Sequence, residues 1–341
     1  MMQDFRRPEQ LILVAATRRV LRCSFIAVLL LTSVVSVGVS SAGATQPNSD
    51  YPAWSSLPTL AQLQSELAHA SAKTTITSHE ISGLQVGNPF PDTVENKGQK
   101  HCQSEDEVAY SFAPCVYGDT SSKRVIALVG DSEADMWIPT FDVWGKEYGF
   151  KVDRIEMDGC TAWKEKAPAS ISGWSNCEVK WKAYCVSEIL KLHPFAVVAT
   201  GMLIDSQSAA LVQSPKKTAT GIDKYFSAIS KSKAKLFVLS NIPWAYSIPT
   251  IPSVCVDIHT SDIRVCDAKI DPTMAAALKD VQRKGIAKVI PIDSLFCSTS
   301  LCPVVDREIV LYSDNHHMSH SWATYIARAF SEKFNPMLGI K

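Results

Sequence analysis

The sequence lacks the short motifs that mark several large classes of enzymes. It contains no G-x-x-x-x-G-K-[ST] loop, no G-x-G-x-x-G loop and no G-x-S-x-G segment, which are the usual signatures of P-loop enzymes, dinucleotide-binding domains and α/β-hydrolases. It also lacks an excess of charge, because 34 basic residues balance 34 acidic residues in a chain of 341. Nucleic-acid-binding proteins usually carry a basic excess, so we expect no nucleic acid among the partners.

The common zinc-binding spacings are absent as well. No C-x-x-C pair and no H-E-x-x-H segment occurs, although both are typical of zinc sites. We therefore predict no metal and no cofactor. One alternative stays open, because His316 and His320 are four residues apart. Together with His317 and Asp314 they would suit a metal-dependent hydrolase.

The N-terminus has the composition of an export signal. Five arginines precede an apolar run at residues 23–39, which is followed by the small residues Ala42-Gly43-Ala44. This combination is typical of a secretory signal. We predict that residues 1–44 are a signal peptide cleaved after Ala44 or, alternatively, an uncleaved anchor, because the apolar run approaches the length that spans a bilayer. The rest of the chain is expected outside the cytoplasm, secreted or tethered to the membrane.

Nine cysteines follow this segment, and such a number in an exported chain predicts disulfide bonds. Pairing between sequence neighbours would join Cys102 to Cys115, Cys160 to Cys177, Cys255 to Cys266 and Cys297 to Cys302. Spacing alone does not fix the connectivity. Cys185 is left over in this scheme, and we expect it to be a buried free thiol.

Composition divides the remaining chain into three parts. Residues 45–58 are polar and contain prolines, which predicts a linker. Residues 59–122 are expected to form an N-terminal extension packed on the main domain, with one helix at residues 60–72. Residues 123–341 are expected to form that main domain.

Strands and helices alternate along the main domain. Apolar runs predict strands at residues 124–129, 151–157, 195–200, 234–240 and 287–292. Helical periodicity predicts helices at residues 134–149, 177–192, 220–232, 271–285 and 320–334. Apolar strands separated by helices indicate a parallel sheet covered on both faces, that is, a three-layer α/β/α sandwich. Ligands bind such a sheet at the carboxyl ends of its strands.

The stretch RVIALVGDSEADMW, residues 124–137, places Ser132 at the carboxyl end of the first strand. A serine there is often only a helix cap. A serine nucleophile needs a base, and the base needs a group that orients it. Asp314 and His317 lie three residues apart in YSDNHHMSHSW, residues 312–322. This spacing puts both side chains on one side of a turn, where the carboxylate can hold one imidazole nitrogen while the other points at a serine.

These two segments resemble the conserved blocks of the SGNH, or GDSL-like, family of hydrolases and acyltransferases. The chain resembles in particular the SGNH domains fused behind membrane acyltransferases that O-acylate cell-surface polysaccharides. The residues that carry the resemblance are Gly130-Asp131-Ser132, Asp314-Asn315-His316-His317, Cys115-Val116-Tyr117-Gly118-Asp119, Gly159-Cys160 and the segment CSTSLCPV at 297–304.

The resemblance implies a flavodoxin-like parallel SGNH sheet and an acyl-enzyme mechanism. By this resemblance Ser132 is the nucleophile, His317 is the general base and then acid, and Asp314 orients His317. The backbone N–H groups of Ser132 and Gly159 would form the oxyanion hole.

Three positions near the expected site need separate mention. The family places an asparagine after the third strand, where this chain has ATGMLIDS; Gly201 is the candidate third oxyanion donor, and Asn241 follows the fourth strand instead. Glu133 stands where the fused relatives usually carry histidine. Trp244 lies in a proline-rich loop after the fourth strand and is a candidate substrate contact.

Together these features predict an exported serine esterase or O-acyltransferase, with an O-acetyl group as the expected ester. Its partner would be an acylated or acyl-accepting glycan of the cell envelope. A transferase would also need a separate membrane protein as acyl donor, because this chain has one hydrophobic segment at most. The alternative function, favoured by Glu133 and the missing asparagine, is a non-catalytic SGNH-fold binding protein of the envelope.

Overall fold

The computed structural model describes residues 51–85, 115–161, 163, 181–201, 214–243, 251–270, 272–285, 287–299 and 301–340. Several predicted features lie outside these ranges. They are the signal segment, the first part of the expected linker, the start of the helix expected at 177–192, Trp244, Cys102 and Cys177.

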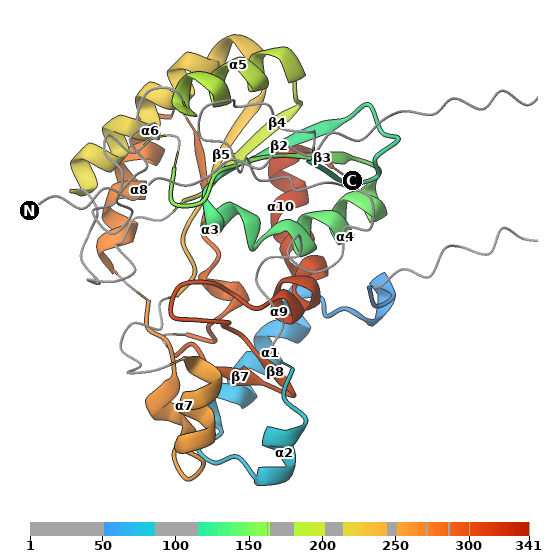
Figure 1. Ribbon diagram of the computed structural model, residues 1–341, viewed down its shortest axis with the longest axis vertical. Helices are drawn as coiled ribbons and strands as arrows, with labels where there is room; N and C mark the ends of the chain where they lie inside the picture. The colour runs from blue at the N-terminus through green and yellow to red at the C-terminus, as the bar shows by residue number, and fades with distance from the viewer. Residues whose placement is uncertain are drawn as a thin grey trace, which may run out of the picture. The chain divides into compact units, whose positions relative to one another are not determined.

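A six-stranded sheet with the order β1-β3-β2-β4-β5-β6 forms the centre of the described fold (Figure 1). Its strands are Cys115–Gly118 (β1), Val125–Gly130 (β2), Lys151–Glu156 (β3), Ala196–Ala199 (β4), Lys235–Leu239 (β5) and Lys288–Ile290 (β6). Strands β2 to β6 run parallel in the flavodoxin-like order, so the predicted parallel sheet is confirmed. The antiparallel edge strand β1 was not predicted, because it is short and lies in a polar region.

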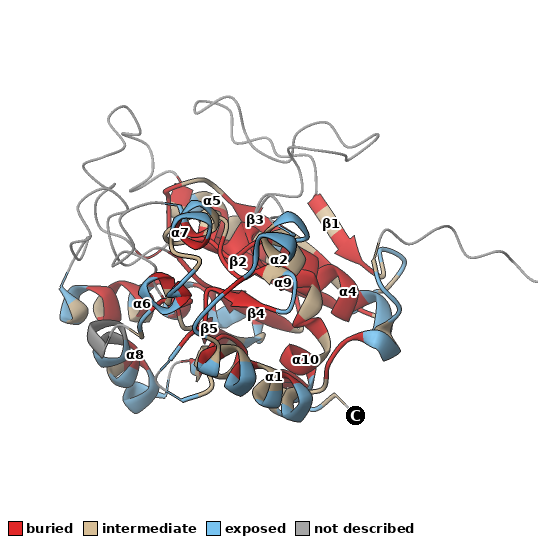
Figure 2. Cartoon of the chain, turned by 90° about the horizontal axis from the view of Figure 1, so that it is seen from below, coloured by how far each residue is buried: buried red, intermediate tan, exposed pale blue. Residues whose placement is uncertain are grey.

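Helices cover both faces of this sheet (Figure 1). On one face lie α1 (Leu60–Ala72), α4 (Ile138–Tyr148) and α10 (Ala327–Leu338), and on the other lie α5 (Lys182–Leu192), α6 (Pro215–Ile229) and α8 (Pro272–Lys284). Strand β2 contributes side chains to the cores on both faces of the sheet. Ile126 and Leu128 pack into the core on the side of α1, α4 and α10, and Ala127 and Val129 pack into the core on the side of α5, α6 and α8. The strands are buried and the outer sides of the helices are exposed (Figure 2). The three-layer sandwich is therefore confirmed.

Two predicted long helices are each divided into two. The helix expected at 134–149 consists of α3 (Ser132–Asp135) and α4, and the helix expected at 320–334 consists of α9 (His320–Tyr325) and α10. Pro139 explains the first break, because it occupies the first turn of α4 and a proline there cannot continue the hydrogen-bond ladder of a preceding helix. The helix expected at 220–232 begins earlier, at Pro215, where the Ser214 side chain accepts from the Lys217 N–H; its end, Ser230–Ser232, is the 3-10 helix η4.

The N-terminal extension contains the predicted helix α1, which begins with a capping box formed by Thr59 and Gln62. Two further elements were not predicted: the 3-10 helix η1 (Trp54–Ser56), inside the expected linker, and the helix α2 (Ser78–Ser82). Leu57 is buried and its carbonyl accepts from Arg328, so the end of the expected linker is packed and ordered.

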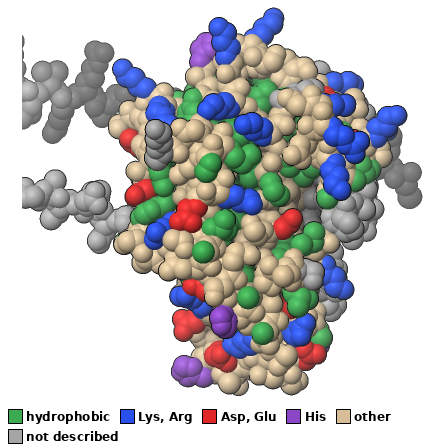
Figure 3. Space-filling view, turned by 180° about the vertical axis from the view of Figure 1, so that it is seen from behind, with side chains coloured by type: hydrophobic (Ala, Val, Ile, Leu, Met, Phe, Trp, Pro, Cys, Tyr) green, Lys and Arg blue, Asp and Glu red, His purple; other side chains and the backbone are tan. Residues whose placement is uncertain are grey.

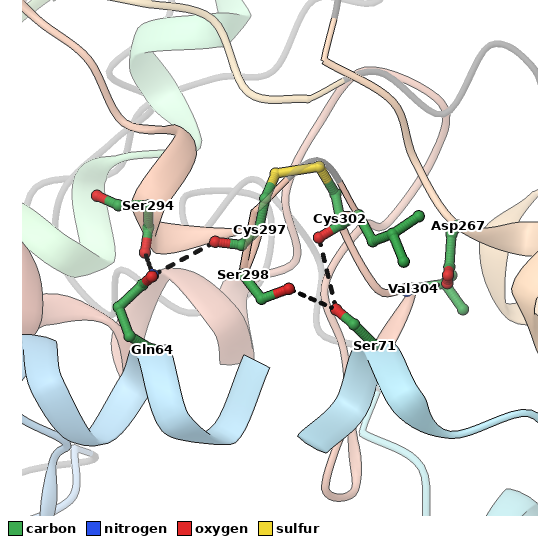
Figure 4. The surroundings of a disulfide bond; sticks show 9 residues. Gln64, Ser71, Asp267, Ser294, Cys297, Ser298, Cys302 and Val304 are labelled. Atoms are coloured by element: carbon green, nitrogen blue, oxygen red, sulfur yellow. Dashed lines mark hydrogen bonds between the residues drawn. A yellow bond between two sulfur atoms is a disulfide. The ribbon is translucent and has the colours of Figure 1, made fainter. Parts of the chain in front are cut away.

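A smaller group of elements gathers at the end of the molecule that is lower in Figure 1. Besides α2, it contains α7 (Pro252–Ile258), η5 (Ile263–Cys266), η6 (Asp293–Leu295) and the hairpin of β7 (Val305–Asp306) and β8 (Ile309–Val310). Helix α1 contacts its disulfide loop (Figure 4): Gln64 donates to the Cys297 carbonyl at 3.3 Å, and Ser298 donates to Ser71 at 3.2 Å. These contacts join the extension to the C-terminal half.

Two of the expected disulfide bonds are present, Cys255–Cys266 and Cys297–Cys302. Cys115 and Cys160 are each disulfide-bonded, and the partners expected for them lie outside the described ranges. Cys185 is a buried free thiol, as predicted.

Charged side chains on the surface and the apolar character of the helices are two further features of the fold. On the face opposite Figure 1, Lys and Arg side chains spread over the upper part and acidic side chains mix with them lower down (Figure 3). Within the described ranges, no helix combines the length and the apolar character that a bilayer crossing requires.

Candidate active site

Ser132 is the first residue of α3 and directly follows the turn at the end of β2. Asp131 caps this helix, since its Oδ1 accepts from the Glu133 N–H at 3.1 Å. The turn requires glycine at position 130, because a Cβ there would lie 2.2 Å from the Thr200 carbonyl oxygen and 2.8 Å from the Ala134 Cβ. The tight passage from strand to helix thus holds Ser132 at the carboxyl edge of the sheet.

His317 lies between Ser132 and Asp314. Its Nε2 is 2.9 Å from the Ser132 Oγ, and its Nδ1 is 2.7 Å from the Asp314 Oδ2. With a proton on Nδ1, the imidazole donates to the carboxylate and its Nε2 can accept from the serine hydroxyl. The structure therefore brings together three residues that the sequence separates by up to 185 positions.

The loop that carries His317 is held from several sides. Asp314 Oδ1 accepts from the backbone N–H groups of His316 and His317, at 2.8 and 2.7 Å. Ser319 caps α9 by accepting from the Trp322 N–H, and its own hydroxyl donates to the Val310 carbonyl at 2.6 Å. These bonds fix the imidazole before any substrate arrives.

The electrostatics of the loop favour a charged Asp314 beside a neutral His316. Burial alone would raise the pKa of Asp314, but the hydrogen bond and charge of His317, assisted by His316, lower it to about 2. Burial and the neighbouring His317 lower the pKa of His316 to about 4. Asp314 is therefore ionised at neutral pH, as a group that stabilises an imidazolium must be.

The loop after β3 carries the expected oxyanion donor Gly159, whose φ of 67° lies in the left-handed region that favours glycine. The Met157 N–H donates to the Gly130 carbonyl at 3.3 Å, and the Thr161 hydroxyl donates to Asp131 Oδ2. Ser132 and Gly159 thus come from the ends of neighbouring strands, and Thr161 ties the two segments together.

Gly201 and Asn241 are neighbours in the structure. The buried Asn241 side chain donates from Nδ2 to the Gly201 carbonyl at 3.1 Å. From its position after the fourth predicted strand, Asn241 was expected one element too late for the site. Because the carboxyl ends of parallel strands meet at one edge, residues just after β4 and β5 lie side by side, and this rule provides a signal for the contact. Asn241 holds the segment that carries Gly201.

Glu133 and His316 border the catalytic pair. One ligand atom from each of Glu133, His316 and His317 lies within 4.8 Å of the other two. The metal set considered from the sequence is different, since it contained His320. The ring of His320 stacks on Tyr51, with the ring centroids 6.3 Å apart. Among the described residues, Glu133 takes the place that the sequence analysis gave to His320.

A buried ionic network on the inner side of α3 was not predicted. Arg154 Nη1 lies 3.0 Å from Asp135 Oδ1, and Nη2 lies 2.5 Å from Glu156 Oε2. Burial, followed by repulsion from Glu156 and Asp158, raises the pKa of Asp135. Burial raises the pKa of Glu156 to about 8 despite Arg154. Four charged residues in the six of β3, which lies inside the sheet between β1 and β2, were the available signal.

Comparisons with known proteins identify a family for the chain. The family model of the SGNH domain (fused to AT3 domains) matches residues 101–332. The search of curated proteins returned no match.

Three solved structures illustrate the similarity of fold. The periplasmic domain of a lipopolysaccharide acetyltransferase from Salmonella ser. Paratyphi A matches with a TM-score of 0.50 and 11% identity, covering 64% of this chain and 85% of that one. A GDSL-like lipase from Bacteroides thetaiotaomicron matches with a TM-score of 0.40 and 11% identity, covering 63% and 89%. A catalytic mutant of an acetylxylan esterase from Geobacillus stearothermophilus matches with a TM-score of 0.40 and 11% identity, covering 65% and 97%.

Proposed function

The chain belongs to the family of SGNH domains that are fused to AT3 domains, and from this premise we propose that it is an exported enzyme which cleaves or transfers O-acyl groups of a cell-envelope glycan through Ser132. Its enzyme class is that of the serine-type ester hydrolases and O-acyltransferases. The observation that carries the proposal is the hydrogen-bonded chain from Asp314 through His317 to Ser132, with distances of 2.7 and 2.9 Å.

In the proposed mechanism, His317 Nε2 accepts the hydroxyl proton while Ser132 Oγ attacks the ester carbonyl carbon. The ionised Asp314 stabilises the imidazolium, and the backbone N–H groups of Ser132 and Gly159 donate to the oxyanion. Collapse of the tetrahedral intermediate breaks the bond to the sugar oxygen, which receives the proton from His317. The acyl group then rests on Ser132 until a second nucleophile, activated in the same way, releases it.

The second nucleophile distinguishes the two reactions within this proposal. Water gives a hydrolase, and a sugar hydroxyl gives a transferase. The family association with AT3 domains supports an acyl ester of a glycan as substrate. In the transferase case a separate membrane protein would supply the acyl group.

Location outside the cytoplasm is part of the proposal. It is supported by the basic and apolar N-terminal segment and by the disulfide bonds Cys255–Cys266 and Cys297–Cys302, since disulfides persist in oxidising compartments. The periplasmic origin of the Salmonella domain named above is consistent with it.

The proposal is tested with protein produced from the full sequence in an exporting bacterial host. Acetate release is measured from 4-nitrophenyl acetate and from an O-acetylated polysaccharide, beside Ser132→Ala. We expect release by the wild type that the variant abolishes. Equal release by both proteins would contradict the proposal. Deacetylation without any membrane partner would argue against an obligate transferase.

A further inference from the structure

We propose that Glu133, His316 and His317 form a binding site for a zinc ion, and that zinc bound there reversibly inhibits the serine chemistry. The binding half of this inference stands on the geometry of the three residues alone. The inhibition half rests on the proposed function.

The three side chains converge from two elements. Glu133 belongs to α3, and both histidines belong to the loop before α9. Their ligand atoms lie within 4.8 Å of one another. In a tetrahedral zinc site with bonds near 2.0–2.1 Å, two ligand atoms lie about 3.4 Å apart. A contraction of at most about 1.4 Å between these atoms would therefore close the site around an ion.

The surroundings of both imidazoles are those of metal ligands. His317 Nδ1 is bonded to Asp314 Oδ2 at 2.7 Å, and His316 Nδ1 is bonded to Asn315 Oδ1 at 2.7 Å. A metal-binding histidine typically donates its other ring N–H to a carboxylate or an amide oxygen, which fixes the tautomer and orients the ring. Because both Nδ1 atoms are engaged in these bonds, the proposal assigns the coordination of the ion to the two Nε2 atoms.

The donor set favours zinc over the harder cations. Two imidazoles and one carboxylate form a set of three protein ligands that leaves the fourth position of a tetrahedral zinc ion open. Magnesium and calcium prefer oxygen ligands. Glu133 is fully buried and His317 is 5% exposed, so water competes weakly for them.

Zinc binding and catalysis would exclude each other because they use the same atom. His317 Nε2, which lies 2.9 Å from the Ser132 hydroxyl, has a single lone pair. When that pair coordinates zinc, it cannot accept the serine proton. Bound zinc would therefore prevent His317 from acting as the general base, and removal of the zinc would restore this role.

Binding is tested on the full-length Ser132→Ala protein, so that the readout does not depend on activity. Zinc is titrated against a chromophoric chelator, and Co²⁺ is used as a spectroscopic probe of tetrahedral coordination. We expect one equivalent to bind. Glu133→Gln and His316→Asn, each added to Ser132→Ala, should weaken binding by at least about 100-fold, because loss of a ligand costs at least as much as loss of a hydrogen-bond partner of a ligand. The control His320→Asn changes a nearby histidine outside the cluster and should leave the affinity unchanged.

Inhibition is tested on protein with Ser132 intact, with each variant compared with its own zinc-free rate. Zinc should inhibit the wild type and a chelator should restore it, whereas Glu133→Gln should need about 100-fold more zinc. Failure of Ser132→Ala to bind zinc, or binding that Glu133→Gln does not weaken, would overturn the site. Activation by zinc would overturn the inhibition. If the wild type shows no esterase activity, the proposed function fails while the titration still decides the site.

Discussion

Two groups of carboxylates lie near the short helix α3, and their surroundings differ. The group reached through Ser132 and His317 is called the outer side, and the group reached through Asp135 and Arg154 is called the inner side. On the outer side, the Asp314 carboxylate accepts three hydrogen bonds from His316 and His317, and its pKa is lowered to about 2. On the inner side, Asp135 and Glu156 are fully enclosed and share the single cation Arg154, and the pKa values of both are raised, chiefly by burial.

This difference shows that the number of hydrogen-bond donors around a buried carboxylate decides whether it stays ionised. Asp314 is also partly buried, yet enough donors surround it to keep its charge. Arg154 is shared by two enclosed carboxylates, and burial raises the pKa values of both. We infer that the outer side of α3 is organised for proton transfer and the inner side for holding the helix in place.

The largest effect is expected from changes on the outer side. Ser132→Ala or His317→Ala should lower kcat for ester hydrolysis by about 10⁴- to 10⁶-fold, because the attack on the carbonyl loses its nucleophile or its base. The free energy of unfolding should change little. A rate within tenfold of the wild type for either variant, in the same acetate-release assay, would contradict the roles assigned to Ser132 and His317.

Asp314→Asn should lower kcat by about 10⁴-fold, since the amide no longer holds the tautomer of His317 or stabilises its positive charge. The variant keeps the shape of the aspartate, so circular dichroism should show a native fold. A loss of less than about tenfold would mean that Asp314 only shapes the loop.

On the inner side, Arg154→Met should cost about 3–5 kcal/mol of unfolding free energy, because it leaves two buried carboxylates without their cation. Urea unfolding measures this loss. The control Arg283→Met removes an arginine whose side chain is 74% exposed and should change stability by less than about 0.5 kcal/mol. Equal effects of the two substitutions would remove the distinction between the sides.

The raised pKa of Glu156 predicts a pH dependence of stability. The pKa of Glu156 rises to about 8 on folding, so the folded state binds more protons than the unfolded state between the two pKa values. Stability should therefore fall as pH rises from 5 to 8, and Glu156→Gln should remove part of this fall. Glu147→Gln, at an exposed position, should leave it intact. A wild-type stability curve parallel to that of Glu156→Gln would contradict the account.

The smallest effect on activity is expected from the loss of a helix cap. Two caps are compared, one that holds the loop of His317 and one that does not. Ser319→Ala and Ser214→Ala each remove a cap and should each cost about 1 kcal/mol of stability. Only Ser319→Ala should also lower activity, by a few-fold, because Ser319 ties the loop of His317 to the Val310 carbonyl. Equal activities of the two variants would show that this tie is dispensable.

The sequence predicted what depends on local patterns. The parallel sheet follows from apolar runs separated by helices, and the Ser132, His317 and Asp314 candidates follow from two short segments with recognisable chemistry. The position of Ser132 follows from the junction of a strand and a turn within residues 124–137. The pairing of Asp314 with His317 follows from their three-residue spacing.

The features that were missed depend on how distant segments align. Arg154 meets Asp135 only because β3 lies beside β2 and α3 folds back over it. Asn241 reaches Gly201 only because β4 and β5 are neighbours in the sheet. The division of the helix expected at 134–149 could have been predicted, because Pro139 marks the first turn of a new helix, α4.

The presence of an activated serine is decided by one experiment, in which the intact mass of protein produced from the full sequence in an exporting host is measured after incubation with a fluorophosphonate, beside Ser132→Ala and His317→Ala. The account predicts one adduct on the wild type and none on either variant, because labelling needs both the serine and its base. A folded, disulfide-bonded wild type without an adduct would contradict it. Ser132 would then be only the start of α3, and the chain would be better studied as a binding protein.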